Sequence, residues 1–407
     1  MNDVERAFRE AHGKAVATLV RVFGDISLAE DAVQDAFVKA LVVWPADGIP
    51  SNPAAWIITT ARHRGVDIAR RQDRGRELAV QMTADPLRGD SVPGPGEDTV
   101  MMRDDRLRLI FTCCHPAIRV EHQVALTLRL IAGLAPAEIA RAFLLSEATL
   151  AKRLVRAKYK ITAAQIPYRV PDDAELPDRL RAVLSVLYLI YNAGADDPEN
   201  RAVLRGEAIR LARALVALMP DEPEAAGLLA LLLLCEARAA ARWSHGEIVL
   251  LRDQDRSKWD RALIREGQDL LLAALARRQI GPFQLQAAIH GAHDAADRYE
   301  ATDWATILRF YDRLVILMPT PVVILNRAIA VAEIHGPEPA LGLLDSVAGE
   351  LDTYHLLHAS RAAMLERMGR RDAAESAYTR AAQLAPTKAE ARFLTARRDR
   401  LAGQHND

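Results

Sequence analysis

The sequence predicts an all-α protein with two small helical domains in its N-terminal part and a longer array of helices in its C-terminal part. Apolar residues recur at helical spacing nearly throughout, and no segment shows sustained alternation with a period of two. Half of the 407 residues are hydrophobic but only 5% are aromatic, which suits packed helices better than β-sandwiches. Segments rich in Pro and Asp interrupt the helical pattern at residues 83–99 and 166–177, and they predict the domain boundaries.

The first helical block covers residues 4–44. Within it, Ser27 and Glu30 have the spacing of a capping box, which predicts the start of a helix. Asn52 followed by Pro53 has the pattern of an N-cap and a first helical residue. Further helices are therefore expected over residues 53–76 and, after the first interruption, over residues 100–160.

One segment near the end of this part is unusually basic. The stretch "SEATLAKRLVRAKYK" (146–160) holds five cations and one acid, although the whole chain has a formal net charge of −1. On a helix, one apolar stripe and one polar basic stripe would lie side by side. The apolar stripe consists of Leu150, Leu154, Ala157 and Ile161, and the basic stripe of Thr149, Lys152, Arg153, Arg156 and Lys160.

The residues just before this segment supply a partner helix and a turn. "APAEIARAFLL" predicts a short helix, and Leu144, Leu145 and Ser146 predict a tight turn. Together they have helix-turn-helix spacing, in which the second helix presents its cations to a groove of DNA. A basic face can equally be the solvated surface of an ordinary helix, so this segment alone leaves both interpretations open.

A second group of polar residues follows one face of the helix expected after Asn52. Trp56, Thr60, His63, Asp67, Arg70 or Arg71, and Arg74 share that face, while Ile57, Ala61 and Ile68 share another. An aromatic ring can stack on an unpaired base while guanidinium groups hold phosphates. Trp56 could equally be a core residue, but crowded arginines repel one another unless an anion meets them.

The distribution of charge also separates the two parts of the chain. Residues 1–170 hold 24 Lys and Arg against 20 Asp and Glu, whereas the remainder holds 29 against 34. The charged N-terminus shows no signal peptide, and the longest apolar run, Ala225–Cys235, is too short to span a bilayer. Three cysteines provide no disulfide framework, so a cytoplasmic protein with no membrane partner is expected.

The C-terminal part contains an internal repeat of 34 residues. Ala328, Ala340, Leu344 and Val347 recur as Ala362, Ala374, Tyr378 and Ala381; Pro386 closes the second unit, and Pro319 lies at the corresponding place before the first. Small residues at helix crossings, one bulky residue on the second helix and a closing proline are the tetratricopeptide (TPR) pattern. Each helix pair buries its apolar face only by stacking on its neighbours, so a TPR-like α-solenoid is predicted.

Three ordered motifs resemble a known family. "AEDAVQDAFVKAL", "AWIITTARHRGVDIARR" and "EIARAFLLSEATLAKRLVRAK" are similar to regions 2.2, 2.3–2.4 and 4.2 of sigma-70-family RNA polymerase sigma factors, and closest to the extracytoplasmic-function group. The tail, through "LPDRLRAVLSVLYLIYN" and "LRDQDRSKWDRALI", resembles the C-terminal TPR-like extension of one subgroup. The resemblance implies sigma region 2 at 1–80, a linker at 81–99, sigma region 4 at 100–165 and a TPR-like regulatory domain at 166–407.

The resemblance also implies roles for particular residues. Asp31, Gln34, Asp35 and Phe37 match the helix that binds core RNA polymerase. Trp56, Arg62, His63, Asp67, Arg70 and Arg71 match the region that melts and reads the −10 element of promoter DNA. Thr149, Lys152, Arg153, Arg156 and, as a phosphate contact, Lys160 belong to the helix expected at the −35 element.

No enzymatic motif accompanies these residues. "FTCCHP" (111–116), with His122 nearby, could suggest a metal site, but adjacent cysteines on a helix diverge and zinc requires four convergent ligands. Buried, inert thiols are the preferred interpretation, and no cofactor is expected. "LRDQDRSKWD" (251–260) is interpreted as a salt-bridge network at the start of a helix rather than as a catalytic site.

The sequence therefore predicts a non-enzymatic sigma factor that binds core RNA polymerase and promoter DNA. Its TPR-like tail is expected to bind a peptide or protein partner and to control activity, packing against the head across "IPYRVPDD". A chain that ends near Arg169 is expected to stay folded. The alternative is a one-component helix-turn-helix regulator or TPR scaffold that senses a ligand or partner without joining polymerase.

Overall fold

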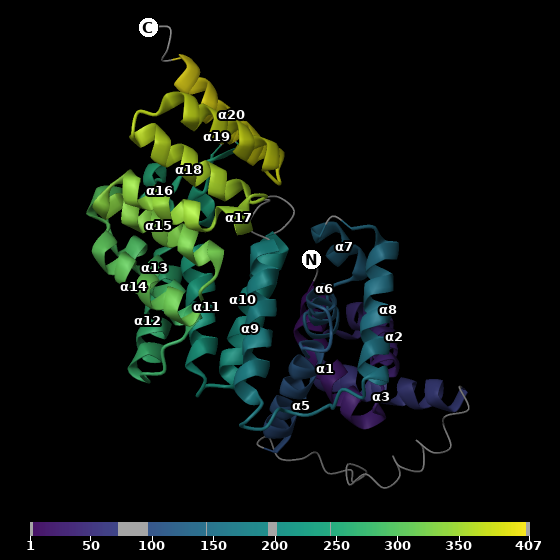
Figure 1. Ribbon diagram of the computed structural model, residues 1–407. Coiled ribbons are helices and arrows are strands. Elements are labelled where there is room, and N and C mark those ends of the chain that lie inside the picture. Colours follow the sequence, from purple (N-terminus) through teal and green to yellow (C-terminus); the bar gives the residue numbers. More distant parts are fainter. Residues whose placement is uncertain (1–2, 72–96, 144, 194–201, 245, 404–407) are drawn as a thin grey trace. The chain divides into compact units, whose positions relative to one another are not determined.

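The computed structural model describes residues 3–71, 97–143, 145–193, 202–244 and 246–403 (Figure 1). The chain divides into two compact units, Met1–Leu218 and Met219–Asp407. Regular structure in the described residues is helical apart from one two-stranded hairpin, so the predicted all-α class is confirmed. None of the helices within these ranges is long and apolar enough to cross a membrane.

The first unit begins with three helices that pack on one another. They are α1 (Asp3–Phe23), α2 (Ile26–Asp47) and α3 (Pro53–Arg71). Gly24 separates α1 from α2 with a φ of 67°, a left-handed conformation that favours glycine. The predicted start of α3 is confirmed, because the Asn52 side chain accepts a hydrogen bond from the backbone N–H of Ala55 at 3.1 Å. The predicted extension of α3 to residue 76 and most of the predicted linker lie outside the described residues.

The predicted capping box at the start of α2 is wrong. Asp25 is the N-cap, and its carboxylate accepts hydrogen bonds from the backbone N–H groups of Ser27 (2.7 Å) and Leu28 (3.1 Å). Glu30 is buried and pairs with two cations that are distant in the sequence. A buried carboxylate gains more from two charged partners than from a backbone N–H at an exposed helix end.

The second group of helices in this unit follows the gap after α3. Its members are α5 (Glu97–Cys113), α6 (Val120–Leu126), the π-helical turn η2 (Thr127–Ile131), α7 (Pro136–Ala142) and α8 (Glu147–Ala163). α5 and η2 pack against α1, and α6 and α7 pack against α8. These contacts join the two groups of helices into one body.

Two further helices complete the first unit, beyond the boundary expected after residue 165. α9 (Leu176–Ala193) and α10 (Ala202–Leu218) pack on each other and on α5, and α9 also packs on α6. Val183 and Leu187 of α9 lie around one small cavity with Ile110 and Ile131. The structural division therefore falls after Leu218, because the apolar faces of α9 and α10 are buried against the first unit.

The second unit is a succession of helices in which each packs on its neighbours along the chain (Figure 1). Its helices are α11 (Pro223–Glu236), α12 (Arg261–Ala276), α13 (Pro282–Ala295), α14 (Trp304–Leu317), α15 (Pro321–His335), α16 (Pro337–Ser346), α17 (Ala348–Leu351), α18 (His355–Arg367), α19 (Arg371–Leu384) and α20 (Lys388–Gly403), with a 3-10 turn, η6 (Tyr299–Ala301), before α14.

The predicted helical repeat is confirmed by the packing of this unit. The pairs α15–α16 and α18–α19 correspond to its two copies. All eight repeated positions are buried in one core cluster: Ala328, Ala340, Leu344, Val347, Ala362, Ala374, Tyr378 and Ala381. Small side chains at the crossings allow close approach of the helices, which is why the spacing of these residues was informative.

An irregular segment, residues 239–260, connects α11 to α12. It contains η3 (Ala239–Ala241), β1 (Trp243–Ser244), β2 (Glu247–Ile248), η4 (Leu251–Asp253) and η5 (Arg256–Lys258), with β1 antiparallel to β2. Its side chains reach three later helices: Glu247 pairs with Arg392 of α20 (3.3 Å), Arg252 with Glu333 of α15 (3.8 Å), and Arg256 donates to the His293 carbonyl of α13 (2.8 Å). The predicted helix start at its end is confirmed, since Asp260 caps α12.

Candidate nucleic-acid interface

Helix α8 carries the basic segment, and its position is fixed by an N-cap and an apolar stripe. The Ser146 hydroxyl accepts a hydrogen bond from the backbone N–H of Thr149 at 3.2 Å. All four residues of the predicted apolar stripe are buried against the first unit: Leu150, Leu154, Ala157 and Ile161. The orientation of α8 is therefore the one that the sequence spacing predicts.

The face of α8 beside this apolar stripe presents the predicted basic stripe. Thr149, Lys152, Arg156 and Lys160 are exposed, and Arg153 is half-buried. The side chains of the four cations form no hydrogen bond or ion pair with any other residue that the structure describes, whereas the Thr149 hydroxyl lies 2.8 Å from that of Ser146. Unpaired cations along one helical face are suited to an anionic partner.

The fifth cation of the segment, Lys158, has a structural role that the sequence did not reveal. Its ammonium pairs with Glu30 of α2, whose second carboxylate oxygen lies 2.5 Å from the Arg129 Nε atom. Burial alone would raise the pKa of Glu30, but the charges of Lys158 and Arg129 outweigh it and lower this pKa. The buried carboxylate thus fastens α2 to η2 and α8.

Helix α3 exposes part of the second predicted face. His63 and Asp67 are exposed, and Arg62 is half-buried. Trp56 is also half-buried, and its ring packs edge-on against the buried Trp44 with the ring centroids 5.3 Å apart. Trp56 therefore packs in part against the core, and its predicted role at an unpaired base stays a prediction. α3 extends to Arg71, but the side chains of Arg70 and Arg71 lie outside the described residues.

The residues expected to bind polymerase lie on α2. Asp31 is exposed, while Gln34, Asp35 and Phe37 are half-buried. Asp35 pairs with Arg64 of α3 at 2.6 Å, so Asp31 is the more accessible carboxylate of the predicted acidic pair. Burial, although partial, raises the pKa of Asp31.

The same face of α2 continues into an exposed apolar surface. Val38 and Val42 are 61% and 74% exposed, and they follow Asp31 and Asp35 at helical spacing. Exposed apolar side chains beside a polar group are typical of a protein-binding surface. The spacing i, i+4, i+7, i+11 was present in the sequence and could have revealed this surface.

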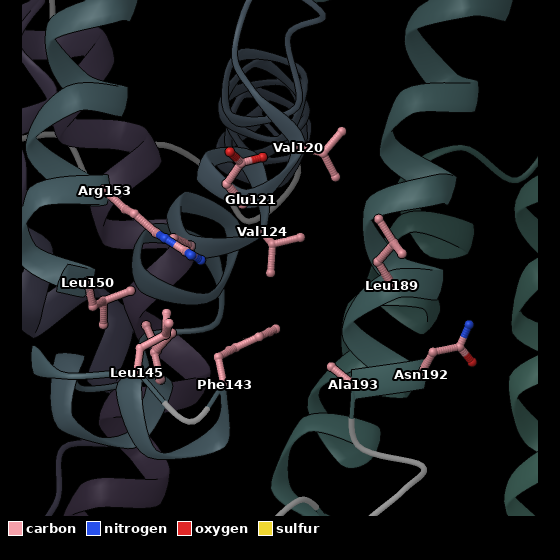
Figure 2. A pocket seen from close by; sticks show the side chains of 12 residues that line it. Val120, Glu121, Val124, Phe143, Leu145, Leu150, Arg153, Leu189, Asn192 and Ala193 are labelled. Carbon is pink, nitrogen blue, oxygen red and sulfur yellow. The ribbon is translucent and has the colours of Figure 1, made fainter. Parts of the chain in front are cut away.

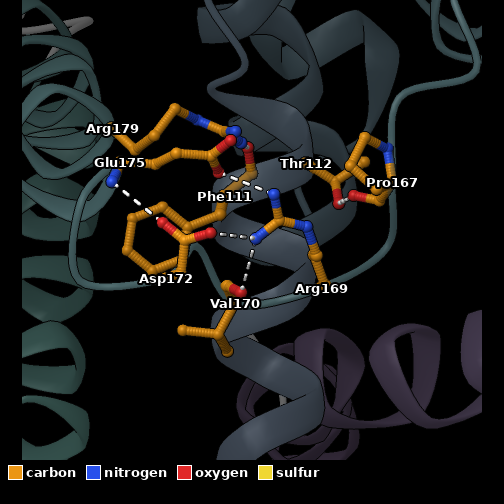
Figure 3. Close-up of polar contacts among 8 residues, drawn as sticks. All are labelled: Phe111, Thr112, Pro167, Arg169, Val170, Asp172, Glu175 and Arg179. Atoms are coloured by element: carbon orange, nitrogen blue, oxygen red, sulfur yellow. Dashed lines mark hydrogen bonds and ion pairs between the residues drawn. The ribbon is translucent and has the colours of Figure 1, made fainter.

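The connection between α8 and α9 is attached to both helical groups of the first unit. The Tyr168 hydroxyl lies 2.7 Å from the Ala17 carbonyl of α1 and 3.1 Å from the Asp105 carbonyl of α5, and Arg179, in the first turn of α9, donates to the Phe111 carbonyl of α5 at 2.7 Å. Figure 3 shows Arg169 pairing with Glu175 (2.8 Å) near Arg179 and Phe111. The connection therefore fixes how the two groups of helices meet.

The cysteine pair at the end of α5 is buried. Burial raises the pKa of Cys114 to about 12 and that of Cys113 well above its usual value, so both are thiols at neutral pH. Within the described ranges, no group of three or more His, Cys, Asp or Glu side chains could hold a metal ion.

Comparisons with known proteins match both parts of the chain. Residues 7–75 match the model of sigma-70 region 2, and residues 179–275 match a family of unknown function, DUF6596. The chain is 42% identical over 407 residues to an uncharacterized protein, R00370, of Rhizobium meliloti (strain 1021), with 98% of this chain and 96% of that protein covered.

Two solved structures show weak similarity to the chain. Yeast Tom70 is 12% identical with a TM-score of 0.38, covering 99% of this chain and 85% of that chain. The TPR domain of P58(IPK) is 13% identical with a TM-score of 0.27, covering 99% of both chains. At these TM-scores the similarity supports no conclusion about fold or function.

Proposed function

This chain belongs to the family of the Rhizobium meliloti protein R00370 and carries sigma-70 region 2 at its N-terminus, and we propose that it is a sigma factor of the extracytoplasmic-function group. Region 2 implies binding to core RNA polymerase. The observation that carries the proposal is the match of residues 7–75 to this region. The unpaired basic face of α8 supports a second DNA-binding element in the same unit.

The surface of α2 is the proposed site for core polymerase. It combines the exposed carboxylate of Asp31 with the exposed side chains of Val38 and Val42. Apolar side chains supply the favourable free energy of association when they are buried, and charges steer the partner. Asp35 pairs with Arg64 of α3 beside this surface.

Helix α3 is the proposed site for the −10 element. Trp56 is anchored on Trp44 at one edge, so its ring needs little ordering before it meets an unpaired base. Arg62, His63 and Asp67 follow along the same helix at accessible positions. Arg70 and Arg71 extend this proposal on sequence grounds alone.

Helix α8 is the proposed −35 reader, entering the major groove as the second helix of a helix-turn-helix. Lys152 and Arg153 lie in its N-terminal half, from which side chains reach base edges. Arg156 follows one turn later, and Thr149 lies at its start. Lys160, near the C-terminal end, is the proposed phosphate contact.

The second unit is the proposed control element. The segment 239–260 lies across α13, α15 and α20, so part of the surface of this unit is occupied by its own chain. Any peptide or protein partner of the TPR-like domain must therefore bind beside this segment or displace it. The hydrogen bonds of Tyr168 to α1 and α5 support the idea that the segment 166–177 helps to set the geometry of the head.

Copurification with core RNA polymerase tests this proposal. Asp31→Lys should abolish association with core enzyme, because a like charge opposed to a basic partner costs several kcal/mol, roughly, at an interface. Asp173→Lys is the matched control, since Asp173 is an exposed acid on the connection before α9. The control should associate as the unchanged protein does. If neither the unchanged protein nor the Asp173→Lys control binds core polymerase, the result favours a regulator that acts without polymerase.

A further inference from the structure

A cavity of about 460 Å³ lies in the first unit between the α7–α8 pair and the C-terminal end of α9 (Figure 2). Its walls are mostly apolar: Val120, Val124, Ile139, Phe143, Leu150 and Leu189. Cavities of roughly 300–1,000 Å³ with apolar walls and few polar groups are typical of small-molecule sites. The volume is far larger than a packing defect, which holds at most a few atoms.

The wall of this cavity leaves apolar surface in contact with water. Leu189 of α9 is 42% exposed and Val120 at the start of α6 is 50% exposed. Figure 2 shows these two side chains among those that line the cavity. An apolar ligand would remove this surface from water, which is favourable in proportion to the area that it covers.

Arg153 is the cation among the residues that line the cavity, where Glu121 and Asn192 are the other polar side chains. Arg153 extends from α8 toward the cavity in Figure 2, and it is half-buried without an ion pair or side-chain hydrogen bond to another described residue. Glu121 also lines the cavity, but it is exposed and does not pair with Arg153. A half-buried guanidinium without a partner favours a carboxylate, which can accept two parallel hydrogen bonds from it.

We propose that this cavity binds a small carboxylic acid with an apolar body, the carboxylate on Arg153 and the body between Val124, Phe143 and Leu189. The proposal extends to regulation, and that extension rests on the proposed function, in which Arg153 reads promoter DNA. A ligand that holds the guanidinium in the cavity would then withdraw it from the groove. Occupancy would weaken DNA binding through α8.

Calorimetric titration with decanoate, below the concentration at which it forms micelles, tests the site in the full-length protein. Decanol is the neutral comparison. Arg153→Met should weaken decanoate binding by at least about tenfold, the loss expected for a charge-assisted hydrogen bond, and leave decanol binding unchanged. Leu189→Trp fills the cavity from α9 and should weaken binding of both probes.

The matched control is Leu272→Trp, which adds the same ring at an exposed leucine of α12. It should bind both probes as the unchanged protein does. Circular dichroism of each variant establishes that it is folded. Failure of the unchanged protein to bind decanoate, or equal binding by Leu189→Trp, overturns the site.

The regulatory extension has its own readout, the anisotropy of a labelled promoter duplex. Decanoate should weaken DNA binding by the unchanged protein and by Leu272→Trp, but not by Leu189→Trp. Equal DNA affinity with and without bound decanoate overturns the regulatory extension. Titration of decanoate needs neither DNA nor polymerase, so failure of the proposed sigma function and failure of the site give different results.

Discussion

The buried carboxylate of Glu30 should make one of the largest single-residue contributions to the stability of the first unit. Its side chain is 7% exposed and lies between Arg129 of η2 and Lys158 of α8. Glu30→Ala leaves the Arg129 guanidinium, 10% exposed, without its carboxylate. Removing one partner of a buried ion pair typically costs about 3–5 kcal/mol, because the other charge stays buried.

Two features of the structure favour the lower end of that range. Arg129 keeps a hydrogen bond to the Leu134 carbonyl at 3.1 Å, and the Lys158 side chain, 23% exposed, can regain water. We therefore expect Glu30→Ala to lower the free energy of unfolding by about 3 kcal/mol. The loss should be local at first, in α2, η2 and α8, since these are the elements that Glu30 joins.

Hydrogen exchange of the full-length protein in increasing urea, followed by mass spectrometry, measures this loss segment by segment. Asp35→Ala is the matched control, because it removes the carboxylate of the exposed pair with Arg64 on the same helix. Changing Glu30, Arg129 and Lys158 together to Met should recover most of the stability, since no charge then remains buried. If the backbone amides of α2 and α8 are as well protected from exchange in Glu30→Ala as in Asp35→Ala, the account of this ion pair is wrong.

Three further predictions concern pH, DNA binding and truncation. Burial lowers the pKa of His12 from 6.5 to about 4. Between these pH values the unfolded chain therefore binds more protons than the folded chain. The first unit should lose about 2 kcal/mol of stability from pH 7 to pH 5. His12→Gln should flatten that slope in the same exchange experiment, and an unchanged slope would assign it to other groups. Arg153→Ala should weaken DNA binding at one or two −35 positions by ~1–3 kcal/mol, whereas Lys160→Ala should weaken binding to all duplexes alike. Equal, sequence-independent losses of affinity in anisotropy titrations would mean that α8 attracts DNA by its charge alone. A chain that ends at Leu218 should stay folded, as measured by circular dichroism. A chain that ends at Arg169 should lose helical structure, because it lacks α9 and α10. A stable fold for this shorter chain would contradict the observed packing.

Local patterns in the sequence predicted the elements whose partners are local. The stripe from Leu150 to Ile161 is buried as its spacing implies, and the Asn52 cap starts α3 where expected. The repeated small residues from Ala328 to Ala381 lie in one core. In each case the period of the helix, or the unsatisfied backbone N–H groups of its first turn, determines which side chains are buried or hydrogen-bonded.

The same reasoning does not predict contacts between residues that are distant in the sequence. Glu30 has the spacing of a capping residue, yet its partner Arg129 lies 99 residues away and outcompetes the local N–H group. Helical spacing separates Lys158 from the basic stripe of α8, but it does not show that Lys158 meets the buried Glu30. A sequence pattern shows that a charge is present but not which buried charge it meets.

The boundary of the first unit was also beyond local reasoning. The prolines of residues 166–177 interrupt the helices and so suggested a division between domains. The segment instead attaches to α1 and α5 through the Tyr168 hydroxyl, which lies 2.7 Å from the Ala17 carbonyl and 3.1 Å from the Asp105 carbonyl, and α9 and α10 pack on α5 beyond it. An interruption of helical structure separates domains only where no side chains bridge it.

The most direct test of the central claim is transcription in vitro by purified core RNA polymerase on a promoter library, with and without the full-length protein. The account predicts transcripts that begin at defined positions, downstream of −35 and −10 sequences shared among the active promoters, and only when the protein is present. Arg153→Ala should change which −35 sequences are active. Stable binding of the protein to DNA without association with core polymerase, and without new transcripts, would contradict the claim that it is a sigma factor.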